Sequence, residues 1–221
     1  MVETHNEPNA SLSLQVLPLG PLETNAYLLA DADRKEALLV DAPEGVAQYV
    51  AQFLEEEGVK LVALLLTHGH WDHITDGQAI RSQGATVYAH KGDQAWLEDP
   101  AKMAVAMPPG YTIEPITIDE WLEEGQTLEL MGQSIEVLHV PGHAPGCLAF
   151  YFPSLEIAFV GDAIFAGSIG RTDLPGGSFE TLKASIKEKL YTLPDETMLC
   201  PGHGPATTVE DEKANNPFVK G

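Results

Sequence analysis

Short apolar runs alternate with amphipathic stretches along most of the chain. Residues 59–66 are apolar except for Lys60 and follow Gly58, a pattern typical of a strand buried on both faces. Similar runs predict further strands, at 12–17, 25–30, 37–40, 85–89, 127–131, 134–140, 147–152, 156–160 and 197–200. Turn-forming residues join two pairs of these runs into predicted hairpins, at Gly132-Gln133 and Pro153-Ser154.

Apolar residues recur at helical spacing between several of these runs. One face of residues 45–57 is apolar and Gly58 follows it, which predicts an amphipathic helix. The same spacing predicts three more helices, over 74–83, 91–97 and 178–193. Ser178 can cap the last of them.

Strands and helices alternate in two similar halves, and no linker or shift in composition separates the halves. This order predicts an α/β fold in which two mixed sheets face each other with helices outside, a four-layer αβ/βα sandwich. A length of 221 residues, 44% hydrophobic and 20% charged, suits one globular domain. We expect that domain over residues 12–221, preceded by a flexible tail at 1–11.

The stretch 98–115 has no regular period. Four prolines and a glycine interrupt it, at Pro100, Pro108, Pro109, Gly110 and Pro115. Long loops in compact domains are often functional lids. Three side chains within it could line a pocket mouth, although packing against the scaffold is the expected role of each: Met103, Met107 and Tyr111.

Net charge is the unusual feature of the composition. The 12 basic and 33 acidic residues give −21, which argues against binding a nucleic-acid backbone or an anionic membrane surface. The first ten residues lack the basic and apolar regions of a signal peptide, and no apolar run approaches the length needed to cross a bilayer. We therefore expect a cytoplasmic protein. Cys147 and Cys200 adjoin apolar runs and are expected to be buried, inert thiols.

Four potential metal ligands lie within six positions, directly after the run at 59–66. The stretch reads Thr67-His68-Gly69-His70-Trp71-Asp72-His73. Three more potential ligands follow later apolar runs: His143, Asp162 and His203. A side chain at the end of a strand is held accurately, and imidazole with carboxylate suits zinc or iron. His90 also follows a predicted strand but has no partner motif, so we expect a surface or capping histidine.

Seven ligands are too many for one tetrahedral ion and suit two. The alternative is a structural zinc site, but such a site needs only four ligands and usually includes cysteine. Two-metal centres hold a water between ions roughly 3.5–4 Å apart and lower its pKa to about 7. The sequence therefore predicts hydrolytic chemistry that needs no serine or cysteine nucleophile.

The order H-x-H-x-D-H, followed by distant His, Asp and His, resembles the metallo-β-lactamase superfamily, and the match spans residues 12 to about 216. The resemblance implies the four-layer fold, with the active site along one edge of the sandwich. It implies two divalent metal ions, with zinc expected and iron or manganese as alternatives. It also implies a ligand assignment: His68, His70 and His143 on one ion, Asp72, His73 and His203 on the other, and Asp162 bridging, with Asp72 and Asp162 as the catalytic carboxylates.

Asp41 follows the run at 37–40 and is either a turn former or a carboxylate that orients a metal-bound histidine. Its place at a strand end and the family resemblance favour the orienting role.

Two later segments, 161–177 and 201–218, resemble the short, single-domain glyoxalase II-type hydrolases. The first reads Gly161-Asp162-Ala-Ile-Phe-Ala-Gly-Ser-Ile-Gly-Arg171-Thr-Asp-Leu-Pro-Gly-Gly177. The resemblance implies that a metal-bound hydroxide cleaves a small-molecule thioester, a hydroxyacylglutathione such as S-lactoylglutathione. A thiolate is a good leaving group because the pKa of a thiol is only about 8.5. Arg171 would pair with a substrate carboxylate; an ion pair with Asp173 or another acid is the alternative.

Two departures from that family keep other functions open. Long glyoxalase II enzymes hold glutathione with a helical C-terminal domain, whereas this chain ends soon after His203. Their motif reads T-H-H-H, whereas in this chain Gly69 stands in place of the second histidine. The persulfide dioxygenase branch shares the pieces at 143–147 and 170–173 and uses one iron held by two histidines and an aspartate. Its last histidine lies in A-H-D rather than Gly-His-Gly, which favours the hydrolase. A lactone or ester hydrolase is a further alternative, and the oligomeric state is left open. A non-enzymatic metal-binding protein would be expected to have lost ligands, and none is missing.

Overall fold

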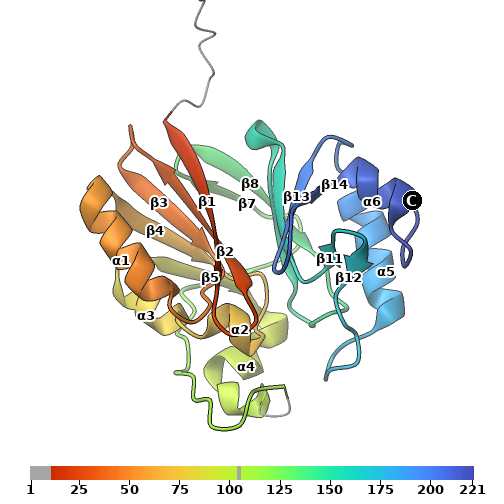
Figure 1. Ribbon diagram of the computed structural model, residues 1–221, viewed down its shortest axis with the longest axis horizontal. Helices are drawn as coiled ribbons and strands as arrows, with labels where there is room; N and C mark the ends of the chain where they lie inside the picture. Colours follow the sequence, from red (N-terminus) through yellow and green to blue (C-terminus); the bar gives the residue numbers. More distant parts are fainter. Residues whose placement is uncertain (1–10, 104–105) are drawn as a thin grey trace, which may run out of the picture.

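Two six-stranded sheets face each other in the computed structural model, which describes residues 11–103 and 106–221 (Figure 1). The first sheet consists of β1 (Leu12–Leu19), β2 (Thr24–Asp31), β3 (Glu36–Val40), β4 (Lys60–Leu65), β5 (Thr86–His90) and β6 (Glu120–Leu122), in that order. Its first three strands pair antiparallel, and β3 to β6 run parallel. The sheet is therefore mixed, as predicted.

The second sheet is also mixed. Across it lie β14 (Thr207–Thr208), β13 (Met198–Pro201), β10 (Ile157–Gly161), β9 (Leu148–Phe152), β8 (Gln133–His139) and β7 (Thr127–Leu130). Only β10 and β13 pair in parallel. A separate small hairpin, β11 (Ile164–Phe165) and β12 (Ser168–Ile169), follows β10.

Helices cover the outer faces of both sheets (Figure 1). The first sheet carries α1 (Val46–Glu57) and α3 (Gly77–Ser82), and the second carries α5 (Phe179–Glu188) and α6 (Val209–Asn215). Two short helices, α2 (Trp71–Ile74) and α4 (Gln94–Glu98), follow β4 and β5. Single 3-10 turns occupy Lys91–Asp93, Pro100–Met103, Pro153–Leu155 and Leu190–Thr192. The predicted four-layer αβ/βα sandwich is confirmed.

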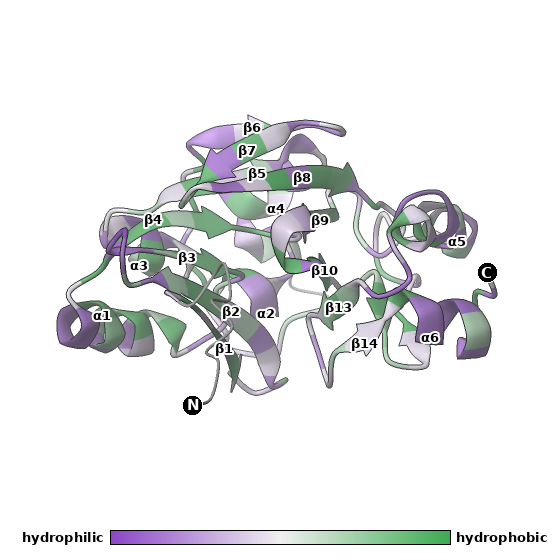
Figure 2. Ribbon diagram, turned by 90° about the horizontal axis from the view of Figure 1, so that it is seen from above, coloured by the Kyte–Doolittle hydropathy of each residue, from purple (hydrophilic) through white to green (hydrophobic). Residues whose placement is uncertain are grey.

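Buried apolar side chains form three core layers, one between the two sheets and one between each sheet and its helices. Leu29 and Leu38 lie in the layer between the sheets, together with Phe150 of the second sheet. Their neighbours Leu28 and Leu39 lie in the layer beneath the helices. Successive residues of a strand point to opposite faces, so a strand covered on both faces is apolar at every position. Figure 2 shows these apolar strands inside and the polar faces of α1 and α6 outside.

Three predicted helices are shorter than their apolar spacing suggested. The helix predicted over 91–97 begins as a 3-10 turn, and its α-helical part is only Gln94–Glu98. The helix predicted over 74–83 is broken, because Asp76 N–H donates to the Ala42 carbonyl and the His73 carbonyl accepts from Ala42 N–H, so both groups are lost to the helix. The Asp76 side chain accepts from Gly45 N–H and Ala47 N–H at 2.9 Å each and so caps the start of α1. The helix predicted over 178–193 ends at Glu188 and continues only as a 3-10 turn. Its predicted cap is confirmed, since the Ser178 side chain accepts from Thr181 N–H.

The first predicted hairpin turns one residue earlier than expected. Met131 and Gly132 both have left-handed backbones, with φ of 52° and 69°, which matches the two-residue turns that suit strand twist. Gln133 consequently begins β8. Pro153 and Ser154 lie, as expected, in the connection between β9 and β10, which is a 3-10 turn.

Within the loop after α4, Met103 is buried, and Met107 and Tyr111 pack against the layer beneath the helices. The packing role expected for these three side chains is confirmed. The tail expected at 1–11 lies, apart from Ser11, outside the described residues. In the described part of the chain, no helix is long and apolar enough to span a membrane.

Candidate metal centre

All seven predicted ligands follow strand ends, and their side chains converge. The loop and helix after β4 carry His68, His70, Asp72 and His73, whereas His143 follows β8, Asp162 follows β10 and His203 follows β13. Helix α2 begins directly after His70, so it turns Asp72 and His73 back toward the same point. The centre therefore draws on both halves of the sandwich.

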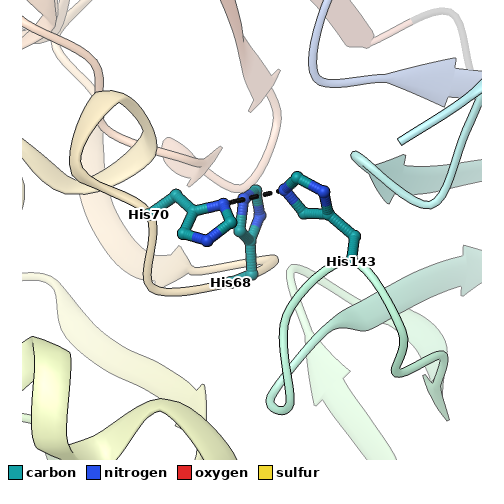
Figure 3. Close-up of side chains that lie close together, drawn as sticks. All are labelled: His68, His70 and His143. Atoms are coloured by element: carbon teal, nitrogen blue, oxygen red, sulfur yellow. Dashed lines mark hydrogen bonds between the residues drawn. The ribbon is translucent and has the colours of Figure 1, made fainter. Parts of the chain in front are cut away.

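Three histidines form the first group of the centre. His68 Nε2 lies 3.1 Å from His70 Nδ1, which lies 2.8 Å from His143 Nε2. Figure 3 shows the rings directed toward one another, with His68 and His70 on one loop and His143 on another. All three rings are buried. Nitrogen atoms that converge away from solvent in this way could hold a common cation.

The second group combines a carboxylate with two histidines. Asp72 Oδ2 lies 3.2 Å from His203 Nε2 and 3.4 Å from His73 Nε2. Thr24 Oγ1 donates to the same oxygen at 2.8 Å and holds the carboxylate in place.

Asp162 lies between the two groups. Its Oδ2 is 3.5 Å from His143 Nε2 and 3.6 Å from His203 Nε2, and its Oδ1 is 3.4 Å from His73 Nε2. The carboxylate thus reaches a histidine of the first group and both histidines of the second.

Unpaired polar atoms show that these residues fit divalent metal ions. His73 Nε2 and Asp162 Oδ1 are buried and have no hydrogen-bond partner among the described residues, a condition that costs about 1–3 kcal/mol per atom. Within each of three sets, one ligand atom from every residue lies within 4.8 Å of the others: His68–His70–His143, His68–His73–Asp162 and Asp72–His73–His203. Imidazole nitrogen and carboxylate oxygen are zinc and iron ligands, so a pair of cations would satisfy both unpaired atoms.

The histidines of the first group are electrostatically suited to be neutral ligands. Burial lowers the pKa of His70 to about 3. Burial, together with the neighbouring His73 and His70, also lowers the pKa of His68, and burial lowers that of His143. Neutral rings keep a free lone pair at neutral pH.

In the second group, nearby carboxylates raise the pKa of a histidine instead of leaving it lowered by burial. Burial alone would raise the pKa of Asp72 and Asp162, but His73 and the other nearby histidines outweigh it and lower both. Burial alone would lower the pKa of His73, but Asp72, Asp162 and Asp41 outweigh it and raise the pKa well above its ordinary value. Cation binding here would therefore release protons.

Polar contacts behind the ligands fix the ring orientations. His73 Nδ1 donates to Asp41 Oδ2 at 2.7 Å, and Thr67 donates to the same carboxylate through its N–H and its hydroxyl at 2.8 and 2.7 Å. His143 Nδ1 donates to the Arg171 carbonyl at 2.8 Å. Asp41 thus makes the contact with a histidine of the motif that its predicted orienting role requires, and each bond leaves the other ring nitrogen aimed at the centre.

Two glycines allow the backbone to approach the centre closely. A Cβ at Gly202 would lie 2.2 Å from Asp162 Oδ1 and 2.5 Å from a ring carbon of His73. A Cβ at Gly170 would lie 1.8 Å from the Asp162 carbonyl oxygen. Neither position can carry a side chain unless the centre moves.

Three residues that support the centre were not identified from the sequence: Thr24, Asp93 and Trp96. Trp96 of α4 stacks on His70, with ring centroids 5.4 Å apart. The Asp93 carboxylate accepts from Gly69 N–H and Gly146 N–H, and burial raises its pKa to about 6 although these bonds oppose the rise. None belongs to a recognisable motif.

A cavity of about 420 Å³ opens onto the centre. Besides His70, Asp72, His143, Asp162 and His203, its lining consists of Leu22, Trp71, Ala106, Phe165, Ser168, Ile169, Arg171 and Leu174. The wall around the candidate ligands is thus mainly apolar, and among the residues that the structure describes Arg171 contributes its one cationic side chain. Arg171 forms a two-bond ion pair with Asp173 at 2.7 and 2.8 Å, the contact expected as the alternative to a substrate carboxylate.

Three other side chains considered from the sequence, Cys147, Cys200 and His90, are not among the seven that converge. Cys147 and Cys200 are buried, and burial raises the pKa of both thiols, to about 12 for Cys200, so the expectation of inert thiols is confirmed. His90 Nδ1 accepts from Gly92 N–H and its ring stacks on His139 at 4.0 Å. His90 is therefore a capping residue, as expected.

The sequence-family model described as the metallo-beta-lactamase superfamily matches residues 19–203. The chain belongs to this superfamily. Within it, the chain is 38% identical over 206 residues to a probable metallo-hydrolase, YqgX, of Bacillus subtilis, covering 93% of this chain and 96% of that protein. It is 37% identical over 213 residues to the hydroxyacylglutathione hydrolase GloC of Haemophilus influenzae, covering 94% and 98%.

Solved structures of the superfamily share the whole fold. BLEG-1, a B3 metallo-beta-lactamase, has a TM-score of 0.84 at 40% identity and covers 95% of this chain and 100% of its own. TTHA1623 in a di-iron-bound form has a TM-score of 0.78 at 38% identity, with 93% and 100% covered. ETHE1 from Myxococcus xanthus has a TM-score of 0.76 at 27% identity, with 93% and 83% covered. The protein is thus a metallo-hydrolase of the superfamily, and the expected family and fold are confirmed.

Proposed function

We propose that this protein is a binuclear metallohydrolase that cleaves thioesters, with a hydroxyacylglutathione such as S-lactoylglutathione as its substrate. The observation that carries the proposal is the convergence of all seven ligand side chains, including the two unpaired atoms of His73 and Asp162. The 37% identity to GloC over nearly the full length supports the substrate class.

In this proposal His68, His70 and His143 would hold one ion, and Asp72, His73 and His203 would hold the other. Asp162, which lies between the two groups, would be shared by them, and zinc is the expected metal. When bound, such ions lower the pKa of water and polarise a carbonyl group. The protein's own part is orientation. Asp41 and the Arg171 carbonyl hold the rings of His73 and His143, and Thr24 holds Asp72.

The cavity lining supports a thioester over substrates with poorer leaving groups. Apart from the proposed ligands, Arg171 is the only ionisable side chain that the described residues contribute to the lining, and a guanidinium does not give up a proton near neutral pH. No lining residue is thus positioned as a separate general acid. A thiolate leaves without one, because the pKa of a thiol is only about 8.5.

A persulfide dioxygenase with a single iron is the second candidate. The observation that favours it is the set His68–His73–Asp162, whose ligand atoms lie within 4.8 Å of one another, because two histidines and one carboxylate are the ligands of many non-haem iron oxygenases. The four further ligand side chains favour the hydrolase, since a single iron has no use for them.

Assays on the metal-loaded wild type separate the candidates. We expect rapid hydrolysis of S-lactoylglutathione, slower cleavage of lactones and simple esters, and no rapid oxygen uptake with glutathione persulfide. Oxygen uptake that depends on iron alone and persists in His203→Ala would overturn the hydrolase proposal and support the dioxygenase.

A further inference from the structure

Asp93 is a buried acid whose carboxylate joins two loops that are distant in sequence. Its Oδ2 accepts from Gly69 N–H at 2.8 Å, and its Oδ1 accepts from Gly146 N–H at 2.7 Å. Asp93 is 2% exposed. It stands at the N-cap position of α4, where an aspartate commonly caps its own helix, yet its side chain makes no capping bond there. The carboxylate serves the two loops instead.

Glycines make this close approach possible. A Cβ at Gly69 would lie 2.9 Å from Asp93 Cβ, and a Cβ at Gly146 would lie 2.6 Å from Asp93 Cγ. Beside Asp93, a Cβ at Gly92 would lie 2.7 Å from the Pro145 carbonyl. Gly69 does not have a left-handed backbone, so the nearby acid, rather than its backbone conformation, restricts this position to glycine.

The two joined loops carry the first group of ligands. Gly69 separates His68 from His70, and Gly146 lies three residues after His143. His70 and His143 come from different sheets, yet their ring nitrogens are 2.8 Å apart. A second link between these segments, from Leu148 N–H to the Thr67 carbonyl at 2.7 Å, lies just before the first loop and just after the second. The Asp93 bonds fix the loops themselves.

We propose that Asp93 is a positioning residue for the metal centre, whose carboxylate sets the distance between the His68–His70 loop and the His143 loop. The inference rests on the metal-holding part of the proposed function and is independent of the substrate. It is specific to aspartate, because each oxygen accepts one N–H. Asparagine has the same volume but only one acceptor, and its amide would face an N–H donor.

The test is titration of metal-free protein with Co²⁺, whose visible absorption reports coordination geometry. We compare wild type with Asp93→Asn, and use His70→Ala to identify the binding step of the three-histidine group. In Asp93→Asn the Co²⁺ affinity of that step should fall about 10–100-fold, the usual cost of losing a contact behind a metal ligand. The absorption bands of that step should also change. The other step should keep its affinity. At saturating Co²⁺ the KM for S-lactoylglutathione should be unchanged.

Asp31→Asn is the matched control. Asp31 is also buried and accepts two backbone N–H bonds, from Asp33 and Arg34 at 3.0 Å each. It is the last residue of β2, whereas Thr24, which contacts Asp72 of the centre, is the first. Both N–H bonds go to a single Asp31 oxygen, which asparagine keeps. Asp31→Asn should therefore change the stability of the metal-free protein little and leave both Co²⁺ steps unchanged.

A second variant keeps the inference testable if Asp93→Asn folds poorly. Gly69→Ala places a methyl group against Asp93 and should weaken the same step selectively. Two results would contradict the inference, in Gly69→Ala or in a folded Asp93→Asn. One is an equal loss of Co²⁺ affinity in both binding steps, and the other is no change of affinity in either step. A wild type that binds Co²⁺ in two steps but cleaves no thioester would defeat the proposed substrate and leave the role of Asp93 intact.

Discussion

At the scale of single residues, the ion pair of Arg171 and Asp173 lies where substrate selection is expected. The side chains are 59% and 70% exposed, and such exposed pairs contribute little to stability because water and salt screen them. A substrate carboxylate could therefore compete with Asp173 for the guanidinium. The Arg171 carbonyl holds His143 independently of its side chain, so both side chains can be changed without removing that contact.

We predict that Arg171→Ala raises the KM for S-lactoylglutathione on the order of tenfold, as expected for one lost hydrogen bond to a charged group, with kcat little changed. Lysine should rescue only partly, because it lacks the two-bond fork. Asp173→Asn should lower KM, since it frees the guanidinium. Steady-state kinetics at constant metal content measure all three variants. An unchanged KM in both Arg171→Ala and Asp173→Asn would leave Arg171 with a structural role only.

The seven candidate ligands could be identified from the sequence because histidine and aspartate after apolar runs carry a recognisable spacing. Their roles as ligands remain a prediction, whereas their convergence is observed. Thr24 and Asp93 could not be identified in this way. Their contacts join residues 48, 24 and 53 positions apart, and a single polar residue gives no sign of such a distant partner.

At the scale of elements, α6 supports the β11–β12 hairpin that lines the cavity. Glu212 on α6 is buried, accepts from Gly167 N–H at the tip of the hairpin and also accepts from Thr207 and Asn216. Asn216 in turn donates to the Ser168 carbonyl. The final helix therefore holds the cavity wall formed by Phe165, Ser168 and Ile169.

We predict that Glu212→Ala lowers the free energy of unfolding by about 1–3 kcal/mol, the cost of leaving buried donors without an acceptor. It should also raise KM without changing the metal content, because no proposed ligand lies on the hairpin. Urea unfolding and steady-state kinetics measure the two effects. Glu212→Gln keeps one acceptor and should be milder, and Glu210→Ala, on the exposed face of α6, should be neutral. Loss of metal in Glu212→Ala would show that the hairpin also shapes the centre.

The long strands and α1 could be predicted because each contains several periods of its apolar pattern. The strands β6, β11, β12 and β14 have two or three residues each, too few to show a period, and they were missed, as was α6. The break between α2 and α3 arises from backbone bonds to Ala42, which take the Asp76 N–H and the His73 carbonyl out of the helical pattern. Tertiary contacts of this kind override local helical spacing.

At the scale of the whole molecule, the centre lies where the two halves of the sandwich meet. Each proposed ion would take ligands from both halves: His68 and His70 with His143, and Asp72 and His73 with His203. The alternation of apolar runs with helices, together with the family resemblance, predicted the two sheets and four layers. The function of the −21 charge could not be read from the sequence, and the fold assigns it none.

The number of metal ions bound per chain tests the binuclear centre most directly. We predict about two ions in the wild type, about one in His203→Ala and fewer than one in Asp162→Ala, because Asp162 is the carboxylate shared by both groups. Thioester hydrolysis, measured on the same samples, should be largely lost in both variants while circular dichroism shows the fold retained. A wild type that binds a single ion at full activity, or an Asp162→Ala variant that still holds two ions tightly, would contradict the account.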